Sequence, residues 1–171
     1  MNRTAGLILS GLLAIGVVYA NGAAGEEEHD PAALARAMPR ATATLETGLK
    51  ASEREGKPIS AKFEIEDNDL QLSVYTLKGN DAMEVVEDPQ TGATVKSEKI
   101  TEDDDLKDAQ AQKAAMAGAT KSLLAATETA VKENSGFRAV SVFPQLQNGH
   151  SVAEVTLLQG ANFKKVTEKL D

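Results

Sequence analysis

One order of secondary structure occurs twice in this chain, and this internal repeat limits the folds available to it. "GKPISAKF" (56–63) aligns with "GFRAVSVF" (136–143) at an offset of 80, so that Phe63 meets Phe143. "LKGNDAMEVV" (77–86) then aligns with "LQGANFKKVT" (158–167) at an offset of 81, and we expect the second copy's first turn to be one residue longer. The identities are few. The repeat therefore rests on a shared pattern: helix, strand, turn, strand, glycine turn, strand.

Period-two alternation identifies the strands of the first copy. From Ile59 to Glu66 the odd-numbered residues are apolar and the even-numbered ones are polar, as in a strand with one buried face. A turn at Asp67-Asn68-Asp69 leads into a second alternating stretch over 70–77, and a third strand contains Met83 and Val85. These strands follow one another closely, so the pattern predicts an antiparallel meander.

Turn residues bound the later strands of each copy. Lys78-Gly79-Asn80-Asp81 precedes the third strand, and Asp88-Pro89-Gln90-Thr91-Gly92 leads into a fourth strand around 94–97. In the second copy Asn148-Gly149 is a strong hairpin signal, and the chain ends at Asp171 without a counterpart of the fourth strand.

Helical spacing precedes each meander. The first helix is expected over residues 41–55, where an apolar stripe falls at Ala41, Leu45, Leu49 and Ser52. The second is expected from Glu102 to about Asn134, with Thr101 as its cap and Gly118 as the place for a bend. Its stripe falls at Ala119, Leu123, Ala126 and Ala130.

These elements predict an α+β fold made of two repeats, each with one helix packed on a three-stranded antiparallel meander. One such unit has about 60 residues, a size that is marginal for independent stability. Two units side by side share a larger core. Their sheets could join edge to edge or pack as separate lobes.

The N-terminus has the pattern of an export signal. Arg3 precedes an uncharged run over residues 5–20, and the small residues around Ala20 suit signal peptidase, so we expect cleavage after Ala20, with Ala23 and Ala24 as alternative sites. An uncleaved anchor is the competing interpretation, but the run is shorter than the roughly 20 residues that span a bilayer. We predict a periplasmic or secreted protein without a stable membrane span.

An acidic leader with a short helix follows over residues 21–40. Asp30 and Pro31 suit the start of that helix, and Pro39 suits its end. Glu26, Glu27, Glu28 and His29 are interpreted as a solvated acidic segment, because one histidine among mobile carboxylates lacks the fixed geometry of a metal site.

Composition excludes several classes of function. The net charge of −8 and the lack of a basic cluster argue against a nucleic-acid partner. The chain has no cysteine, which rules out disulfides, thiolate metal sites and a cysteine nucleophile.

The search for catalytic groups finds none that converge. No sequence motif of a hydrolase, a zinc protease or a nucleotide-binding loop is present. His29 and His150 are interpreted as surface histidines, and Asp67, Asp69, Asp81 and Asp88 as turn residues. We therefore predict no enzyme activity, no catalytic residue, no cofactor and no metal site. The alternative is a small-ligand or divalent-metal sensor that uses Asp67-Asn68-Asp69 and Asp103-Asp104-Asp105.

Residues 41–100 resemble a PepSY domain, most clearly in "EVVEDPQTGATVKSE" (84–98). Residues 119–171 are similar to the same family, although they lack the Asp-Pro-x-Thr-Gly turn. The resemblance covers most of the chain after the leader and consists of turns and alternation. It implies an exported, bacterial, non-enzymatic module, from a family associated with secreted peptidases and the cell envelope and proposed to inhibit or regulate proteolysis.

The predicted organisation is a signal peptide over 1–20, the leader over 21–40, a PepSY-like repeat over 41–100, and a long helix with a second repeat over 101–171. The expected function is a binding or regulatory module for a cell-envelope protein or peptide. The surfaces that we nominate are a free strand edge and the second face of each meander. On that face we place Gln71, Ser73, Tyr75 and Leu77 in the first copy and Val152, Glu154, Thr156 and Leu158 in the second.

Overall fold

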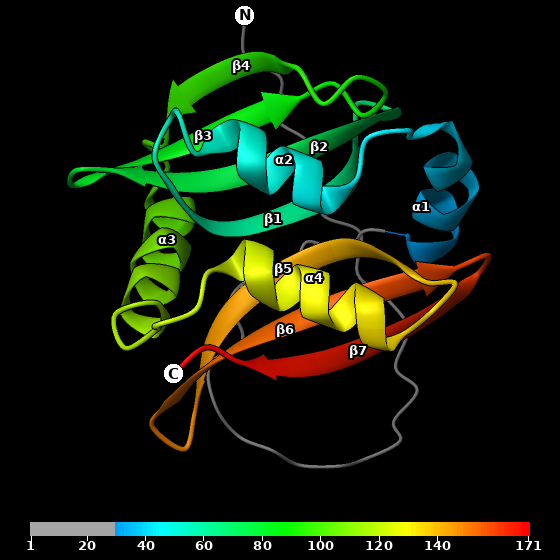
Figure 1. Ribbon diagram of the computed structural model, residues 1–171. Coiled ribbons are helices and arrows are strands. Elements are labelled where there is room, and N and C mark those ends of the chain that lie inside the picture. The colour runs from blue at the N-terminus through cyan, green and yellow to red at the C-terminus, as the bar shows by residue number, and fades with distance from the viewer. Residues whose placement is uncertain (1–29) are drawn as a thin grey trace, which may run out of the picture.

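A computed structural model describes residues 30–171, which form one seven-stranded antiparallel sheet with α-helices on both sides (Figure 1). The strand order is β4-β3-β2-β1-β5-β6-β7. The strands are β1 Lys57–Glu66, β2 Asp69–Lys78, β3 Asp81–Glu87, β4 Thr94–Lys99, β5 Arg138–Gln147, β6 His150–Gln159 and β7 Asn162–Lys169. The helices are α1 Pro31–Ala37, α2 Leu45–Ser52, α3 Asp103–Ala115 and α4 Leu123–Glu133, with a 3-10 turn η1 at Met38–Arg40.

The prediction of an α+β fold is confirmed, but the sheet differs in detail from two three-stranded meanders. The first meander has β4 as a fourth strand, whereas the second ends with β7. The two meanders join edge to edge through β1 and β5, where Ala61 pairs with Val142 and Lys62 with Ser141. Of the two arrangements that the sequence left open, the structure has the continuous sheet.

The strands of the two copies are related by a single offset, and the predicted longer turn in the second copy is wrong. β1 begins at residue 57 and β5 at residue 138, a difference of 81, and each strand has a bulge near its start. Both copies use two-residue hairpin turns with positive φ, at Asp67 and Asn68 and at Asn148 and Gly149. The extra residue lies before β5 instead.

The counterparts on the first strands change accordingly. With an offset of 81, Phe63 corresponds to Pro144, and Lys62 corresponds to Phe143. The shared phenylalanine that suggested an offset of 80 therefore lies on opposite faces of the sheet in the two copies.

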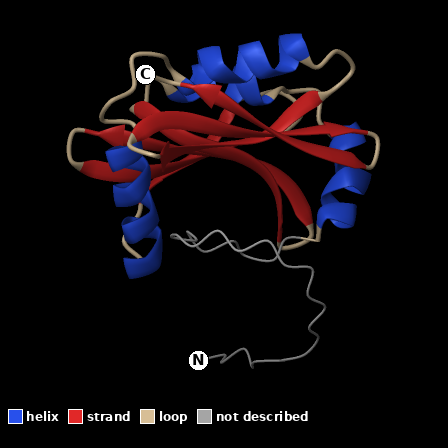
Figure 2. Cartoon of the chain, turned by 90° about the horizontal axis from the view of Figure 1, so that it is seen from below, coloured by secondary structure: helices blue, strands red, loops and turns tan. Residues whose placement is uncertain are grey.

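Helices α2 and α4 cover the same face of the sheet (Figures 1 and 2). Each begins at a hydroxyl cap: Thr44 Oγ1 accepts a hydrogen bond from the Thr47 amide at 3.2 Å, and Ser122 Oγ accepts one from Ala125 at 3.1 Å. The predicted stripe residues within these helices are buried, namely Leu45, Leu49, Ser52, Leu123, Ala126 and Ala130. Ala41 and Ala119 lie outside the helices, and Ala41 is still part of the core.

The predicted long helix from Glu102 to Asn134 is wrong, because the chain breaks it between Ala115 and Leu123. The amides of Thr120 and Lys121 in this break donate to the Leu170 carbonyl, at 2.7 and 2.9 Å. These amides therefore bond the segment after β7 and not the preceding turn of a helix. Thr101 does not cap α3, since Glu102 occupies the cap position and no side chain bonds the free amides there.

The break allows α3 to lie on the face opposite α4. Ser60 Oγ on β1 donates to Gln112 Oε1 of α3 at 2.7 Å. In Figure 2 the sheet is arched, and α3 and α1 project from its two sides, away from α2 and α4. We call this second side the concave face.

The short leader helix is confirmed. Asp30 Oδ1 accepts the Ala32 amide at 2.9 Å, Pro31 opens α1, and Pro39 lies in η1 where the α-helix has ended. Residues 1–20, the predicted cleavage site, Glu26–Glu28 and His29 lie outside the described residues. Within the described part of the chain, no helix is long and apolar enough to cross a membrane.

Arg138, at the start of β5, links the second copy to the entry of the first. Its guanidinium donates to the carbonyls of Met38, Ala41 and Ala43 at 2.7–3.2 Å and lies 5.6 Å from the centroid of the Phe63 ring. Desolvation lowers the pKa of Arg138 against an opposing effect of the Glu46 charge. The contact fixes the segment that leads into α2 against the second copy.

Candidate binding face

The concave face is defined by the strand register. Lys62, Ser73 and Val86 are cross-strand neighbours, as are Ser60, Tyr75 and Glu84, and Lys62 also pairs with Ser141 across the junction. The second copy has three such sets across β5, β6 and β7. The first is Ser141, Thr156 and Lys165; the second is Phe143, Glu154 and Thr167; and the third is Gln145, Val152 and Lys169. Polar residues thus occupy the side of the sheet that α2 and α4 leave open.

The first copy's half carries a hydrogen-bonded network. Lys62 Nζ lies 2.6 Å from Glu64 Oε2, while Gln71 Nε2 donates to Glu64 Oε1 at 3.3 Å and to Ser73 Oγ at 3.0 Å. Lys62 Nζ also lies 6.0 Å from the centroid of the Tyr75 ring. These bonds hold side chains from β1 and β2 in fixed positions.

Burial and neighbouring charges shift the pKa values of this half. Burial acts to raise the pKa of Glu64, but the charge of Lys62 and the hydrogen bonds from Lys62, Ser73 and Gln71 outweigh it, and the pKa lies below its usual value. The pKa of Glu84 is raised by burial and then by the Glu64 charge, and burial and the nearby carboxylates of Glu84, Glu64 and Asp105 raise the pKa of Tyr75. The Tyr75 hydroxyl therefore stays protonated, and it donates to Glu84 Oε1 at 3.5 Å.

The second copy's half has a different chemistry. Phe143 and Gln145 stand where the first copy has Lys62 and Glu64, and Thr156 replaces Tyr75. Lys165 Nζ lies 2.8 Å from Glu154 Oε1. One face therefore presents an acidic, aromatic half beside a half with basic and apolar side chains.

The sequence nominated part of this face and missed part of it. By strand register, Gln71, Ser73, Tyr75 and Leu77 share this face with Val152, Glu154, Thr156 and Leu158, and the two leucines also pack in or against the hydrophobic core. Lys62, Glu64 and Glu84 were not named. Their signal was the polar half of each alternating strand, which indicates the face but not the contacts between its side chains.

The nominated acidic turns do not converge. Among residues 30–171, no group of three or more histidine, aspartate or glutamate side chains is arranged to hold a metal ion. Asp104 Oδ1 is bound to Lys107 Nζ at 2.7 Å, and Asp88 Oδ1 accepts the Gln90 and Thr91 amides within its own turn. His150 Nδ1 lies 2.6 Å from Asp171 Oδ2, and this bond lowers the pKa of Asp171.

The strand edges are charged. Lys96 and Lys99 lie on β4, and Lys164, Lys165 and Lys169 lie on β7. Lysines on an outer strand oppose pairing with a further strand. Of the two surfaces that the sequence nominated, the concave face is therefore better suited to binding than the edges.

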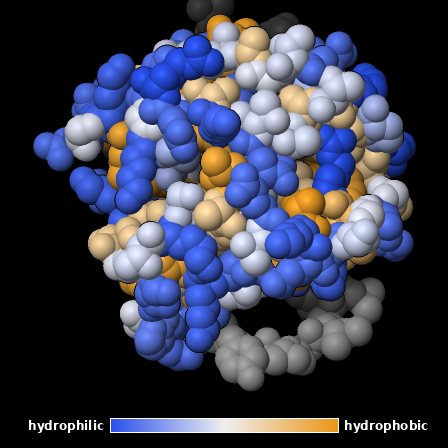
Figure 3. All heavy atoms as spheres, viewed as in Figure 1, coloured by the Kyte–Doolittle hydropathy of each residue, from blue (hydrophilic) through white to orange (hydrophobic). Residues whose placement is uncertain are grey.

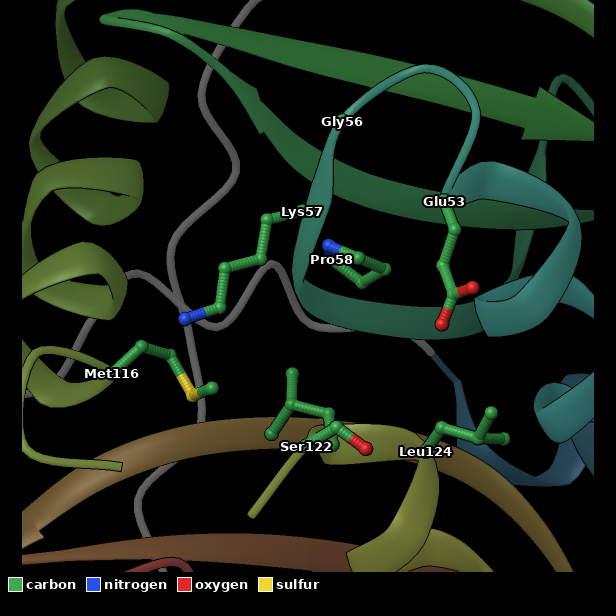
Figure 4. Close-up of a pocket in the computed structure, with 8 residues that line it drawn as sticks. Glu53, Gly56, Lys57, Pro58, Met116, Ser122 and Leu124 are labelled. Carbon is green, nitrogen blue, oxygen red and sulfur yellow. The ribbon is translucent and has the colours of Figure 1, made fainter. Parts of the chain in front are cut away.

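The helical side offers no comparable surface. In Figure 3, hydrophobic side chains appear on it only in small separate patches among hydrophilic ones. A cleft of about 350 Å³ lies at the junction of the copies, between the turn before β1, the end of α3 and the start of α4. In Figure 4 its labelled side chains include Lys57, Pro58, Met116 and Leu124, and they form no convergent polar set.

Comparisons with known proteins identify no family. No family model matches the chain, and no curated protein matches it. Among solved structures, a candidate lipoprotein from Clostridium difficile 630 is similar with a TM-score of 0.40 and 14% identity over 72% of this chain and 81% of that chain.

Proposed function

We propose that this protein is an exported, non-enzymatic binding module that uses the concave face to hold and regulate a cell-envelope protein, with a secreted peptidase as the class of target. The observation that carries the proposal is the asymmetry of the sheet. One face is covered by α2 and α4. The other is covered only in part, by α3 over β1 and β5, and it carries polar side chains that are joined by mutual hydrogen bonds, with Ser73 and Glu64 buried among them. Fixed side chains lose less conformational entropy when a partner binds.

The N-terminal export pattern and the tandem PepSY-like organisation belong to the same proposal. The sequence pattern of a cleavable signal supports a location in the periplasm or outside the cell, where an envelope target is available. The unlike halves of the concave face favour one folded partner over a repeated small ligand, because a partner that spans both copies meets different chemistry in each.

Binding to envelope proteins of the host tests the proposal. Immobilised protein at micromolar concentration should retain one dominant envelope component. Tyr75→Ala together with Thr156→Arg should reduce the retained amount at least tenfold, since it changes both halves of the face. Lys50→Ala with Lys132→Ala, on exposed positions of α2 and α4, is the matched control and should retain as much as the unchanged protein. Retention of nothing, or equal loss in the control, would contradict the proposal.

A further inference from the structure

A carboxyl group is buried beneath α2 with no partner for either oxygen. Glu87 ends β3 on the face that α2 covers, its residue is 0% exposed, and neither Oε1 nor Oε2 has a hydrogen bond within the described structure. Its cross-strand neighbours are Leu72 on β2 and Thr94 on β4, and the Thr94 hydroxyl is likewise buried without a partner. An ionised carboxylate in this position loses its hydration without compensation.

Gly48 in α2 makes the space for this carboxyl. A Cβ atom at residue 48 would lie 2.6 Å from Glu87 Oε2 and 2.5 Å from Leu72 Cδ2. Glycine destabilises a helix interior relative to alanine, and the close approach of Glu87 explains its presence in α2. The helix therefore rests directly on the carboxyl group.

The second copy lacks this arrangement at the corresponding place. Counting from the helix caps Thr44 and Ser122, Gly48 corresponds to Ala126, and with the strand offset of 81, Glu87 corresponds to Glu168. Glu168 is partly exposed to solvent. Only in the first copy is the carboxyl group fully buried beneath the helix.

The charges near Glu87 do not compensate for its burial. Arg54, just after α2, acts to lower the pKa of Glu87, but burial is the larger influence and raises that pKa to about 7. On α2 itself, Glu46 is half-buried and Lys50 is exposed. In the turn after β3, Asp88 accepts the Gln90 and Thr91 amides. On β4, Lys96 Nζ lies 2.8 Å from Glu98 Oε2. No basic group of the described chain is bonded to the Glu87 carboxyl.

We propose that Glu87 is a protonation switch for α2: the helix stays seated on the sheet while the carboxyl holds its proton and is released as the carboxyl ionises. The segment that moves is tied at its start to the turn that follows Glu87. The Ala43 amide before α2 donates to the Pro89 carbonyl at 3.0 Å, and the Thr42 hydroxyl donates to the Gln90 carbonyl, so the helix entry and the turn after Glu87 are joined. Release of α2 would loosen the first copy and leave α4 in place.

The direction of the pH dependence follows from proton binding. The folded state holds a proton on Glu87 up to about pH 7, whereas the open state loses it near the ordinary value of 4.5. Closure of α2 is therefore strongest below pH 4.5, weakens as the pH rises from 4.5 to 7, and stays weak above that.

Hydrogen exchange of the backbone amides in α2 and α4 is the test. After correction for the intrinsic exchange rate, protection of the α2 amides should fall on the order of 100-fold from about pH 5 to about pH 8.5, and α4 should change little. Glu87→Gln should remove the fall in α2, because the amide does not titrate. Glu168→Gln is the matched control and should leave the fall unchanged.

Two results would overturn the switch: α2 protection independent of pH in the unchanged protein, or an equal fall in Glu87→Gln. If Glu87→Gln does not fold, the carboxyl carbon of Glu87 can be titrated by NMR in the unchanged protein. A midpoint near 7 supports the switch, and a midpoint near the ordinary value of 4.5 rejects it.

Discussion

The two copies share one backbone arrangement and differ in the side chains that this arrangement carries. The strands begin 81 residues apart, both first strands are bulged, and both hairpins turn in two residues. Core positions match closely, with Val74 against Val155 and Val85 against Val166. The concave face does not match: Lys62, Glu64 and Tyr75 correspond to Phe143, Gln145 and Thr156. The fold thus constrains the core positions and leaves the residues of the concave face free to differ between the copies.

The copies also differ in what holds their helices. In the second copy, the break before α4 is bonded to Leu170, the residue before Asp171, whereas in the first copy the entry to α2 is held by Arg138 from the other copy. The first copy therefore depends on the second for its helix, and it alone carries a buried carboxyl beneath that helix. Substitutions at corresponding positions can separate these dependences.

The largest effect is expected at Arg138. Arg138→Ala removes bonds to three carbonyls and the contact with Phe63, and we expect a loss of about 3 kcal/mol in the free energy of unfolding. The corresponding residue of the first copy is the exposed Lys57, and Lys57→Ala should change stability by less than about 0.5 kcal/mol. Urea unfolding measures both. Equal losses of unfolding free energy in the two variants would show that the contacts of Arg138 with the first copy do not stabilise it.

A smaller loss is expected from Gly48→Ala, about 2 kcal/mol, because the new methyl group overlaps Leu72 and Glu87. Ala126→Gly at the corresponding position should cost about 1–2 kcal/mol, through helix propensity and the loss of a buried methyl group. Combining Gly48→Ala with Glu87→Ala should cost less than the sum of the two single changes, since both act on the same space. Additive losses in thermal or urea unfolding would rule out the close packing of helix and carboxyl.

The smallest effect concerns the helix caps, where the copies should behave alike. Thr44→Ala and Ser122→Ala each remove one hydroxyl that accepts an amide of the first turn, and each should cost about 1 kcal/mol. Replacement by the other capping residue, Thr44→Ser or Ser122→Thr, should restore most of that loss. A large difference between the two copies in urea unfolding would show that their helices do not begin in the same way.

Local patterns predicted much of this fold. Alternation located β1 and β2, the Asp30-Pro31 pair located α1, and the turn residues located the hairpins. The helix break after Ala115 was missed because residues 102–134 favour a helix throughout, and only the distant carbonyl of Leu170 specifies the break. The offset of the copies was misjudged because two phenylalanines matched by chance on opposite faces of their strands.

The binding face was predictable as a face but not as a site. Polar positions on β2 and β6 are visible from alternation, whereas the bond between Lys62 and Glu64 depends on rotamers, and the junction of β1 with β5 brings together residues about 80 positions apart. Glu87 comes two residues after the inward-facing Val85, so the alternation of the strand predicts that Glu87 also faces inward. Its burial depends on Gly48, which no local pattern connects to it.

Site-specific photocrosslinking in the cell envelope of the host tests the central claim most directly. A photoreactive residue is placed in turn at Gln71, Tyr75, Thr156 and Thr167 on the concave face, and at the exposed Lys50 and Lys132 on α2 and α4. Capture of one and the same protein from both halves of the concave face, with none from the helices, is the result that our account predicts. Capture from the helices instead, or from no position, would contradict it.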